Sequence, residues 1–202
     1  MRKGRPPKKV NENFFVQESK AMWYVLGISY ANYSQNLQRG VYPENIWQSS
    51  SKPLIEIVKS CLESEHKIHN FTYNNIRKGG KDFEIYGLST FNQRIYGSLA
   101  ERGLDVPKQN RKFPKKIKEQ YLDHFIRGFF DAQVSCGERH GYLMLGICYN
   151  IQFLQSLYSA LVEHANVRGG REVTKSLLTL AGYDTIATHD FIYRNWDYIK
   201  KH

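Results

Sequence analysis

The sequence contains one pattern twice, and this duplication limits the folds that it can adopt. The stretches "LGISYANYS", from Leu26, and "RGFFDAQVS", from Arg127, each read as an apolar helix that ends at a polar amide. Five pairs of positions match at a constant offset of 101 residues, which predicts a duplicated unit rather than coincidence. These pairs are Gly27 and Gly128, Ala31 and Ala132, Asn32 and Gln133, Ser34 and Ser135, and Gly40 and Gly141.

A second matched segment follows in each half, after the register slips by two residues. The segments "KPLIEIVKSCLES" and "IQFLQSLYSALVEHA" both read as amphipathic helices with one apolar side. The apolar positions correspond in order: Leu54, Ile55, Val58 and Leu62 in the first half, and Phe153, Leu154, Leu157 and Leu161 in the second.

Each half therefore predicts the order helix, two strands, helix, two strands, helix, an α/β (α+β) fold of two pseudosymmetric αββαββα repeats. Hairpins are expected around Gly40, around residues 78–81 and around Gly141, and a shortened hairpin within "RGGREVTKSLLTLAG". Gly103 fits the end of the helix that closes the first half. We expect a basic arm at residues 1–13, repeats at 14–104 and 119–202, and a linker at 105–118.

The charge balance points to a polyanionic partner. The 202 residues include 29 Lys and Arg but 19 Asp and Glu, a net charge of +10. The cations are clustered, which favours nucleic-acid binding over charge that merely keeps a protein soluble. The arm "RKGRPPKK" resembles an AT-hook and suits a narrow A·T-rich minor groove, although a disordered tail attracted to phosphates explains it equally. The linker lies between two matching units and is expected to cross a phosphate backbone.

The cysteines give no sign of a metal site or a disulfide framework. They number three, at positions 61, 136 and 148, and no CxxC spacing occurs. The N-terminus lacks the apolar segment of a secretory signal, and no apolar run predicts a membrane span. We expect a cytoplasmic, nucleoid-associated protein, or a nuclear or organellar one in a eukaryote, that needs no cofactor.

Small residues within the repeated helix predict how the halves meet. Gly27 and Ala31 stand four apart, as do Gly128 and Ala132, so each pair lies on one helix face. Two small residues there let another backbone approach closely, and the other copy of the helix is the simplest partner. Ordinary small core residues are the alternative for a single pair, but two pairs at equal spacing favour a tight seam between the helices.

These residues resemble the two motif helices of a single-chain LAGLIDADG homing endonuclease. The resemblance covers about residues 10–198 and extends to the element order. It implies a pseudosymmetric monomer whose two antiparallel sheets form a saddle along the major groove of double-stranded DNA. In active members an acid followed by glycine ends each motif helix, and the two acids hold divalent metal ions, usually magnesium.

This chain departs from the family at those positions. The metal-binding acids fall on Asn32 and Gln133, and the glycines that follow them fall on Tyr33 and Val134. A neutral amide is a poor ligand for a hard dication, so we expect no metal and no catalytic residue. Asp131 matches an earlier acid of the motif and is expected to form structural hydrogen bonds near the seam.

The resemblance also suggests which residues contact nucleic acid, with basic strand edges and polar strand side chains as candidates. A solvated strand edge without function remains the alternative for the basic cluster. The predicted contacts are Arg2, Lys3, Arg5, Lys8, Lys9, Gln35, Gln38, Arg39, Gln48, Lys78, Lys81, Lys108, Arg111, Lys112, Lys115, Lys116, Arg139, His140, Arg168, Arg171 and Lys175.

The function that follows is sequence-specific binding of double-stranded DNA without cleavage, with a role as a transcriptional regulator or repressor, for example in a phage or mobile element. Two alternatives stay open. One is a Mg²⁺-dependent homing endonuclease with residual or nicking activity, and the other is an RNA-splicing maturase that binds intron RNA.

Overall fold

The computed structural model describes residues 8–38, 42–73, 83–139, 141–168, 173 and 176–194, without the side chains of residues 37, 38, 42, 73 and 139. The predicted contacts Arg2, Lys3, Arg5, Arg39, Lys78, Lys81, His140, Arg171 and Lys175 lie outside the described residues. No helix in the described ranges has the length and apolar character needed to cross a bilayer.

The first half has the predicted order of elements. It consists of α1 (Lys20–Asn32), β1 (Tyr33–Gln38), β2 (Tyr42–Ser49), α2 (Lys52–Cys61), β3 (Ile68–Tyr73), β4 (Phe83–Phe91) and α3 (Gln93–Leu99). A short π-helical turn (Ala100–Leu104) ends the half, and Gly103 within it has a φ of +82°. This left-handed conformation is the one that glycine adopts without strain, so Gly103 ends the helix as predicted.

The second half has the same order in its described residues. It consists of α4 (Glu119–Gln133), β5 (Val134–Arg139), β6 (Tyr142–Cys148), α5 (Ile151–His164), β7 (Leu177–Ala181) and α6 (Tyr183–Tyr193). Of the shortened hairpin expected before α6, residues 169–172, 174 and 175 lie outside the described residues, and the described part contributes strand β7.

The two sheets are antiparallel and separate. The first has the strand order β1-β2-β4-β3, and the second has the order β5-β6-β7. Helices α2 and α3 pack on the first sheet, while α5 and α6 pack on the second. The predicted apolar positions of α2 and α5 are all buried, so both helices cover their sheets through the matched faces: Leu54, Ile55, Val58 and Leu62, and Phe153, Leu154, Leu157 and Leu161.

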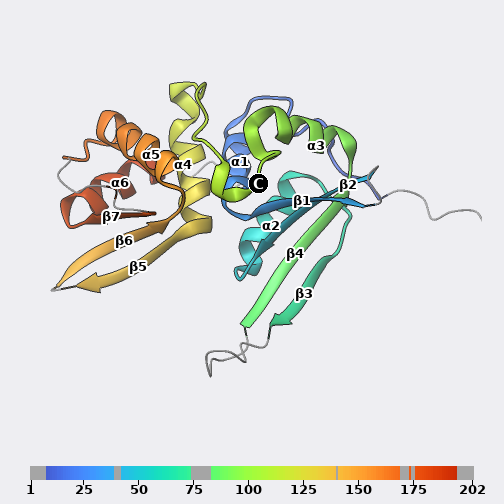
Figure 1. Ribbon diagram of the computed structural model, residues 1–202, viewed down its shortest axis with the longest axis horizontal. Coiled ribbons are helices and arrows are strands. Elements are labelled where there is room, and N and C mark those ends of the chain that lie inside the picture. Colours follow the sequence, from blue (N-terminus) through green and yellow to red (C-terminus); the bar gives the residue numbers. More distant parts are fainter. Residues whose placement is uncertain are drawn as a thin grey trace, which may run out of the picture.

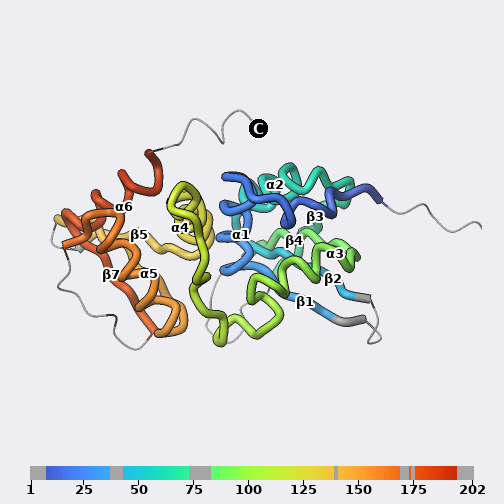
Figure 2. The backbone as a smooth tube through the Cα atoms, turned by 90° about the horizontal axis from the view of Figure 1, so that it is seen from above, coloured from blue at the N-terminus to red at the C-terminus, as the bar shows by residue number. Residues whose placement is uncertain are grey.

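Helices α1 and α4 lie side by side at the centre and join the two halves (Figures 1 and 2). Helix α1 begins at Ser19, whose side chain accepts a hydrogen bond from the backbone N–H of Met22. Residues 22–31 of α1 are all buried, since the helix has α4 on one side and its own sheet and α2 on the other. From this pair the sheets extend outward and down in the view of Figure 1.

Side chains alternate between two faces of each sheet. Tyr33, Trp47 and Leu88 are cross-strand neighbours that point toward the helices and are buried. Ser34, Ile46 and Ser89 are the next neighbours along and point the other way. We call this second side the outer face of the first sheet. The outer face of the second sheet includes Ser135, Gly146 and Thr179.

Candidate nucleic-acid interface

The contact between α1 and α4 depends on two glycines. A Cβ atom on Gly27 would lie 2.1 Å from the backbone oxygen of Phe125, and one on Gly128 would lie 1.9 Å from that of Tyr24. No side chain fits at such distances, so glycine at both positions is what lets the backbones touch. Of the other small residues predicted for this seam, Ala31 is buried and Ala132 is half-buried.

Asp131 connects a third helix to α1 and α4 through hydrogen bonds. Its carboxylate accepts hydrogen bonds from the hydroxyls of Tyr24 in α1, at 2.8 Å, and Tyr193 in α6, at 2.6 Å. The Arg127 guanidinium lies 3.6 Å away and over the rings of both tyrosines. The structural role expected for Asp131 is therefore confirmed, because its two oxygens connect α1, α4 and α6.

The helix ends that carry Asn32 and Gln133 meet the linker. Neither α1 nor α4 has a basic residue in its last turn, although the last carbonyl groups of a helix carry partial negative charge. The linker supplies two cations there instead. Arg111 reaches the end of α1, and Lys108 reaches the end of α4.

Arg111 corrects one predicted DNA contact. The residue is buried, and its guanidinium donates to the backbone carbonyls of Ser29 at 3.2 Å, Tyr30 at 2.8 Å and Tyr33 at 2.8 Å. All of these acceptors belong to the end of α1. Arg111 therefore caps a helix within the protein, and its charge is not available to a phosphate group.

Lys108 lies at the second helix end. Its ammonium donates to Oε1 of Gln133 at 2.9 Å and lies 5.5 Å from the centre of the Tyr149 ring. Partial burial of the ammonium, together with the nearby charge of Arg111, lowers the pKa of Lys108. The Gln133 amide is fixed from its other side as well, since Nε2 donates to the carbonyl of Cys148 at 2.8 Å.

The side chains at this centre do not fit a magnesium ion. The amide oxygen of Gln133 already accepts a hydrogen bond from a cationic group, and the half-buried Asn32 has an amide nitrogen without a hydrogen-bond partner. A hard dication requires several oxygen ligands, usually with carboxylates among them. In the described part of the chain no group of three His, Cys, Asp or Glu residues is placed to hold a metal.

Two glutamines predicted to contact bases lie on different faces. Gln48 is exposed on the outer face of the first sheet, as an interface residue requires. Gln35 points to the helix side, where its amide nitrogen donates to the carbonyl of Asp105 at 2.9 Å. Gln35 therefore does not lie on the outer face with Gln48, because neighbouring strand residues face opposite ways, and the outward positions of β1 are Ser34 and Asn36. Gln38 and Arg139 end their strands, and their side chains are not described.

The remaining linker lysines lie away from the helix ends. Lys115 and Lys116 border a hollow of about 330 Å³ together with Trp23 and Leu26 of α1 and with Glu18, which precedes that helix. Lys118 pairs with Glu18, immediately before the start of α1. The linker thus runs from the ends of the two helices back toward the beginning of α1. Lys112 is exposed between these two regions.

Three further predicted contacts are exposed on the periphery. Lys8 and Lys9 lie beside the segment that comes after α2 in the chain. There the backbone N–H of Lys9 donates to the Glu65 carboxylate at 3.1 Å. Arg168 lies with its guanidinium 4.0 Å from the centre of the Tyr183 ring at the start of α6. Each of these residues leaves its charge near solvent.

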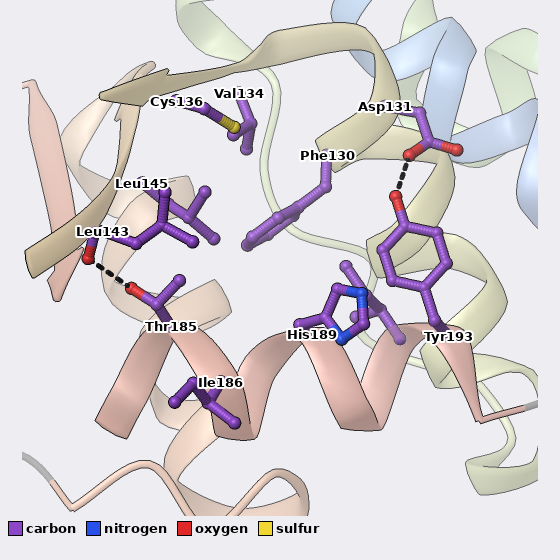
Figure 3. Close-up of a pocket in the computed structure, with 11 residues that line it drawn as sticks. Phe130, Asp131, Val134, Cys136, Leu143, Leu145, Thr185, Ile186, His189 and Tyr193 are labelled. Atoms are coloured by element: carbon purple, nitrogen blue, oxygen red, sulfur yellow. Dashed lines mark hydrogen bonds between the residues drawn. The ribbon is translucent and has the colours of Figure 1, made fainter. Parts of the chain in front are cut away.

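A larger hollow of about 530 Å³ lies between α6 and the second sheet (Figure 3). Its walls are mostly apolar and include Phe130, Leu143 and Leu145, and the Asp131–Tyr193 hydrogen bond lies at its edge. Val134, Cys136, Leu143 and Leu145 point into it, so it lies on the helix side of the sheet. The outer face is separate from this hollow.

The sequence prediction missed the exposed aromatic side chains of the first sheet. Phe71 and Phe83 are 46% and 44% exposed on the outer face, and Phe91 is 55% exposed farther along β4. The alternation in "HNFTY", with His69 and Phe71 on one side, could have indicated this face.

No protein-family model matches the sequence, and no curated protein matches it. Solved structures are similar in fold. The homing endonuclease I-WcaI bound to its DNA recognition sequence superimposes with a TM-score of 0.63 and 10% identity, over 91% of this chain and 86% of that one. The LAGLIDADG meganuclease I-AabMI bound to uncleaved DNA matches with a TM-score of 0.49 and 12% identity, over 85% and 82% of the two chains. The N-terminal LAGLIDADG domain of DUF199/WhiA matches with a TM-score of 0.48 and 13% identity, over 90% of this chain and 89% of that one. The pair of glycine-packed helices, the two antiparallel sheets and the similarity to I-WcaI together establish that this chain has the LAGLIDADG homing endonuclease fold.

Proposed function

We propose that this protein binds double-stranded DNA sequence-specifically and does not cut it. The main support for the absence of cleavage is the contact between Lys108 and Gln133, because a lysine ammonium holds the oxygen that a metal ion would need. Arg111 and Lys108 together neutralise the helix ends at the centre of the molecule.

The support for DNA as the ligand is the fold combined with charge. The similar chain I-WcaI was solved with its DNA recognition sequence bound, and the present chain has a net charge of +10. The outer faces of the two sheets are the surfaces that this proposal assigns to the DNA. Neither is covered by a helix in the described part of the protein, and a β-sheet surface can enter the major groove.

A role as a regulator or repressor follows from binding without cleavage. A protein that occupies a specific site and leaves it intact changes the access of other proteins to that site. This role depends on specificity, so the first experiment must establish whether one sequence is preferred.

The test is a selection from random duplexes, followed by a salt titration of the selected duplex. We expect one enriched sequence, and a logarithm of affinity that falls linearly with the logarithm of salt concentration, by about 0.9 for each phosphate contact. No enrichment, or an affinity that does not respond to salt, would show that the proposal is wrong. Stronger binding to folded RNA than to the selected duplex would favour the maturase alternative.

The second part of the test concerns cleavage. The selected duplex is incubated with Mg²⁺ or Mn²⁺ and either the natural chain or the double variant Asn32→Asp/Gln133→Asp. The natural chain is expected to leave both strands intact. Buffer alone and purified Lys108→Ala protein are the controls. Cleavage by the natural chain that buffer alone does not produce would establish the endonuclease alternative.

A further inference from the structure

The β3–β4 hairpin has an apolar face that no described helix covers. Phe71, Phe83 and Ile85 are close neighbours on its outer face, and both phenylalanine rings are more than two-fifths exposed. The opposite face of the same hairpin is polar: Asn70 and Tyr86 both donate hydrogen bonds to the Glu84 carboxylate. An alternation that puts the apolar side chains outward indicates a surface built to contact something.

Side chains from two strands gather around a glycine on this face. Gly87 pairs with Gln48 on β2 and with His69 on β3, and the ring of Phe71 reaches it from the diagonal position. A Cβ atom at residue 87 would be 3.2 Å from Cε2 of Phe71 and 3.7 Å from Cγ of Gln48. The Phe71 ring and the Gln48 side chain, through its Cγ, therefore both approach the backbone of Gly87, and the His69 ring lies 6.3 Å from that of Phe71.

Covering the glycine accounts for only part of this arrangement. A ring placed over a strand glycine protects the backbone beneath it, and that role uses one side of the ring. Phe71 remains 46% exposed, and Gln48 is exposed beside it. The exposed parts of both side chains lie on the outer face of the first sheet.

The charge pattern identifies nucleic acid as the partner. Among the described side chains on the outer face of the first sheet there is no Lys or Arg. In the sequence the cations occur in the connections between strands, with Arg39 between β1 and β2, and Lys78 and Lys81 between β3 and β4. Cations in these connections suit phosphates. The described outer-face side chains next to Gly87 are uncharged, with Glu44 farther along β2, and uncharged side chains suit base edges.

The side chains at the centre then determine which bases they can recognise. Guanine is read most often by Arg or Lys, which this face lacks in the described residues. Adenine presents N6 and N7 to the amide of Gln or Asn, and thymine presents a C5-methyl group to apolar side chains such as Phe. Gln48 and Phe71 form such a combination, side by side.

We propose that Phe71 packs against the methyl group of a thymine and that Gln48 hydrogen-bonds an adjacent adenine, so that the first sheet reads A·T pairs. This inference rests on the proposed function, because it specifies which duplexes the outer face binds. It assigns the preference to two residues and to one chemical group of the DNA.

The experiment replaces each thymine of the selected duplex in turn by deoxyuridine, which lacks only the methyl group. For the natural chain, at least one position is expected to bind about fourfold more weakly after replacement, the effect of losing contact with one methyl group. In the Phe71→Ala variant that penalty should disappear, whereas Phe71→Leu should keep part of it. The Gln48→Ala variant should accept other base pairs at the neighbouring position. Val162→Ala, an exposed apolar change on α5, is the control and should keep the full penalty.

The outcomes separate this inference from the proposed function. If no duplex is selected, the proposed function fails and this inference fails with it. If a duplex is selected but no deoxyuridine position weakens binding, or Phe71→Ala keeps the penalty while its melting curve shows a folded protein, the inference is wrong and DNA binding stands. A stable dimer that protects Phe71 in the free protein would also overturn it, since the apolar face would then be a subunit interface.

Discussion

The backbone oxygen of Tyr24 lies 1.9 Å from the position that a Cβ atom on Gly128 would occupy. This relationship makes a direct prediction. Gly128→Ala must push α1 and α4 apart, and we expect the free energy of unfolding to fall by at least about 2 kcal/mol, as for an overpacked core. Urea denaturation measures the change.

Gly97 in α3 provides the matched control, because a Cβ there would meet nothing within 4 Å. Gly97→Ala should leave stability unchanged or raise it by up to about 1 kcal/mol, since alanine favours the helix. Equal losses in the two variants would show that the close approach of the helices does not determine stability.

Arg111 is predicted to act as a structural residue. In Arg111→Met the carbonyls of Ser29, Tyr30 and Tyr33 lose the guanidinium as a donor in a buried site, although Tyr30 keeps its hydrogen bond from Tyr149 and Ser29 keeps that from the Tyr33 N–H. We expect a loss of about 2 kcal/mol. The unfolding free energy of Arg111→Lys should lie between those of the natural chain and Arg111→Met, because one ammonium cannot reach all the acceptors that the wider guanidinium reaches. The exposed neighbour Lys112 is the control, and Lys112→Met should change the unfolding free energy by less than about 0.5 kcal/mol.

Lys108 is predicted to affect DNA binding more than stability. Its ammonium lies at the end of α4, one of the two central helices that join the sheets to which the proposed function assigns the DNA. Lys108→Gln should lower the slope of log affinity against log salt by about 1, the change expected for the loss of one phosphate contact. Lys59→Gln, on α2 and so on the helix side of the first sheet, should leave the slope unchanged. Equal slopes for all three proteins would exclude a phosphate contact by Lys108.

His124 predicts a pH dependence of stability. The side chain is 2% exposed, its Nε2 has no hydrogen-bond partner, and burial lowers its pKa despite the nearby Asp123. Because the unfolded chain then binds a proton more readily, this contribution to stability is complete above pH about 6.5 and declines as the pH falls toward the folded-state pKa.

The measurement is the urea midpoint between pH 7.5 and pH 5.5. His124→Gln should show a smaller decline than the natural chain, even if it is less stable throughout. The exposed His189→Gln should reproduce the natural slope. An unchanged slope in His124→Gln would contradict the assignment.

The parts of the fold that repeat were predictable from the sequence, because the duplication tests each pattern twice. Gly27 and Gly128 could be paired by their offset, and the apolar positions of α2 and α5 by their spacing. The place of Arg111 was not predictable in this way. In the sequence it is one cation among several in the linker, and its burial depends on the end of α1, 78 residues from it at Tyr33.

Gln35 and Phe71 show why the sequence could not predict which strand side chains lie on which face of a sheet. A shift of one residue in strand register exchanges the two faces, and polar residues occupy both faces of β1. The hydrogen bond from Gln35 to Asp105 fixes that side chain inward, through a contact that no local pattern reveals. The outward position of Phe71 depends likewise on the pairing of β3 with β4.

The position of Arg111 also bears on how such a chain can be assembled. Two copies of a half, made as separate polypeptides, could reproduce the contact between paired glycines, but they would lack the guanidinium that closes the end of α1. The connection between the halves therefore supplies a group that the first half needs, because all three acceptors of the Arg111 guanidinium lie at the end of α1. A first half made without residues 105–118 would leave that helix end without these donors, so separating the halves removes more than a tether.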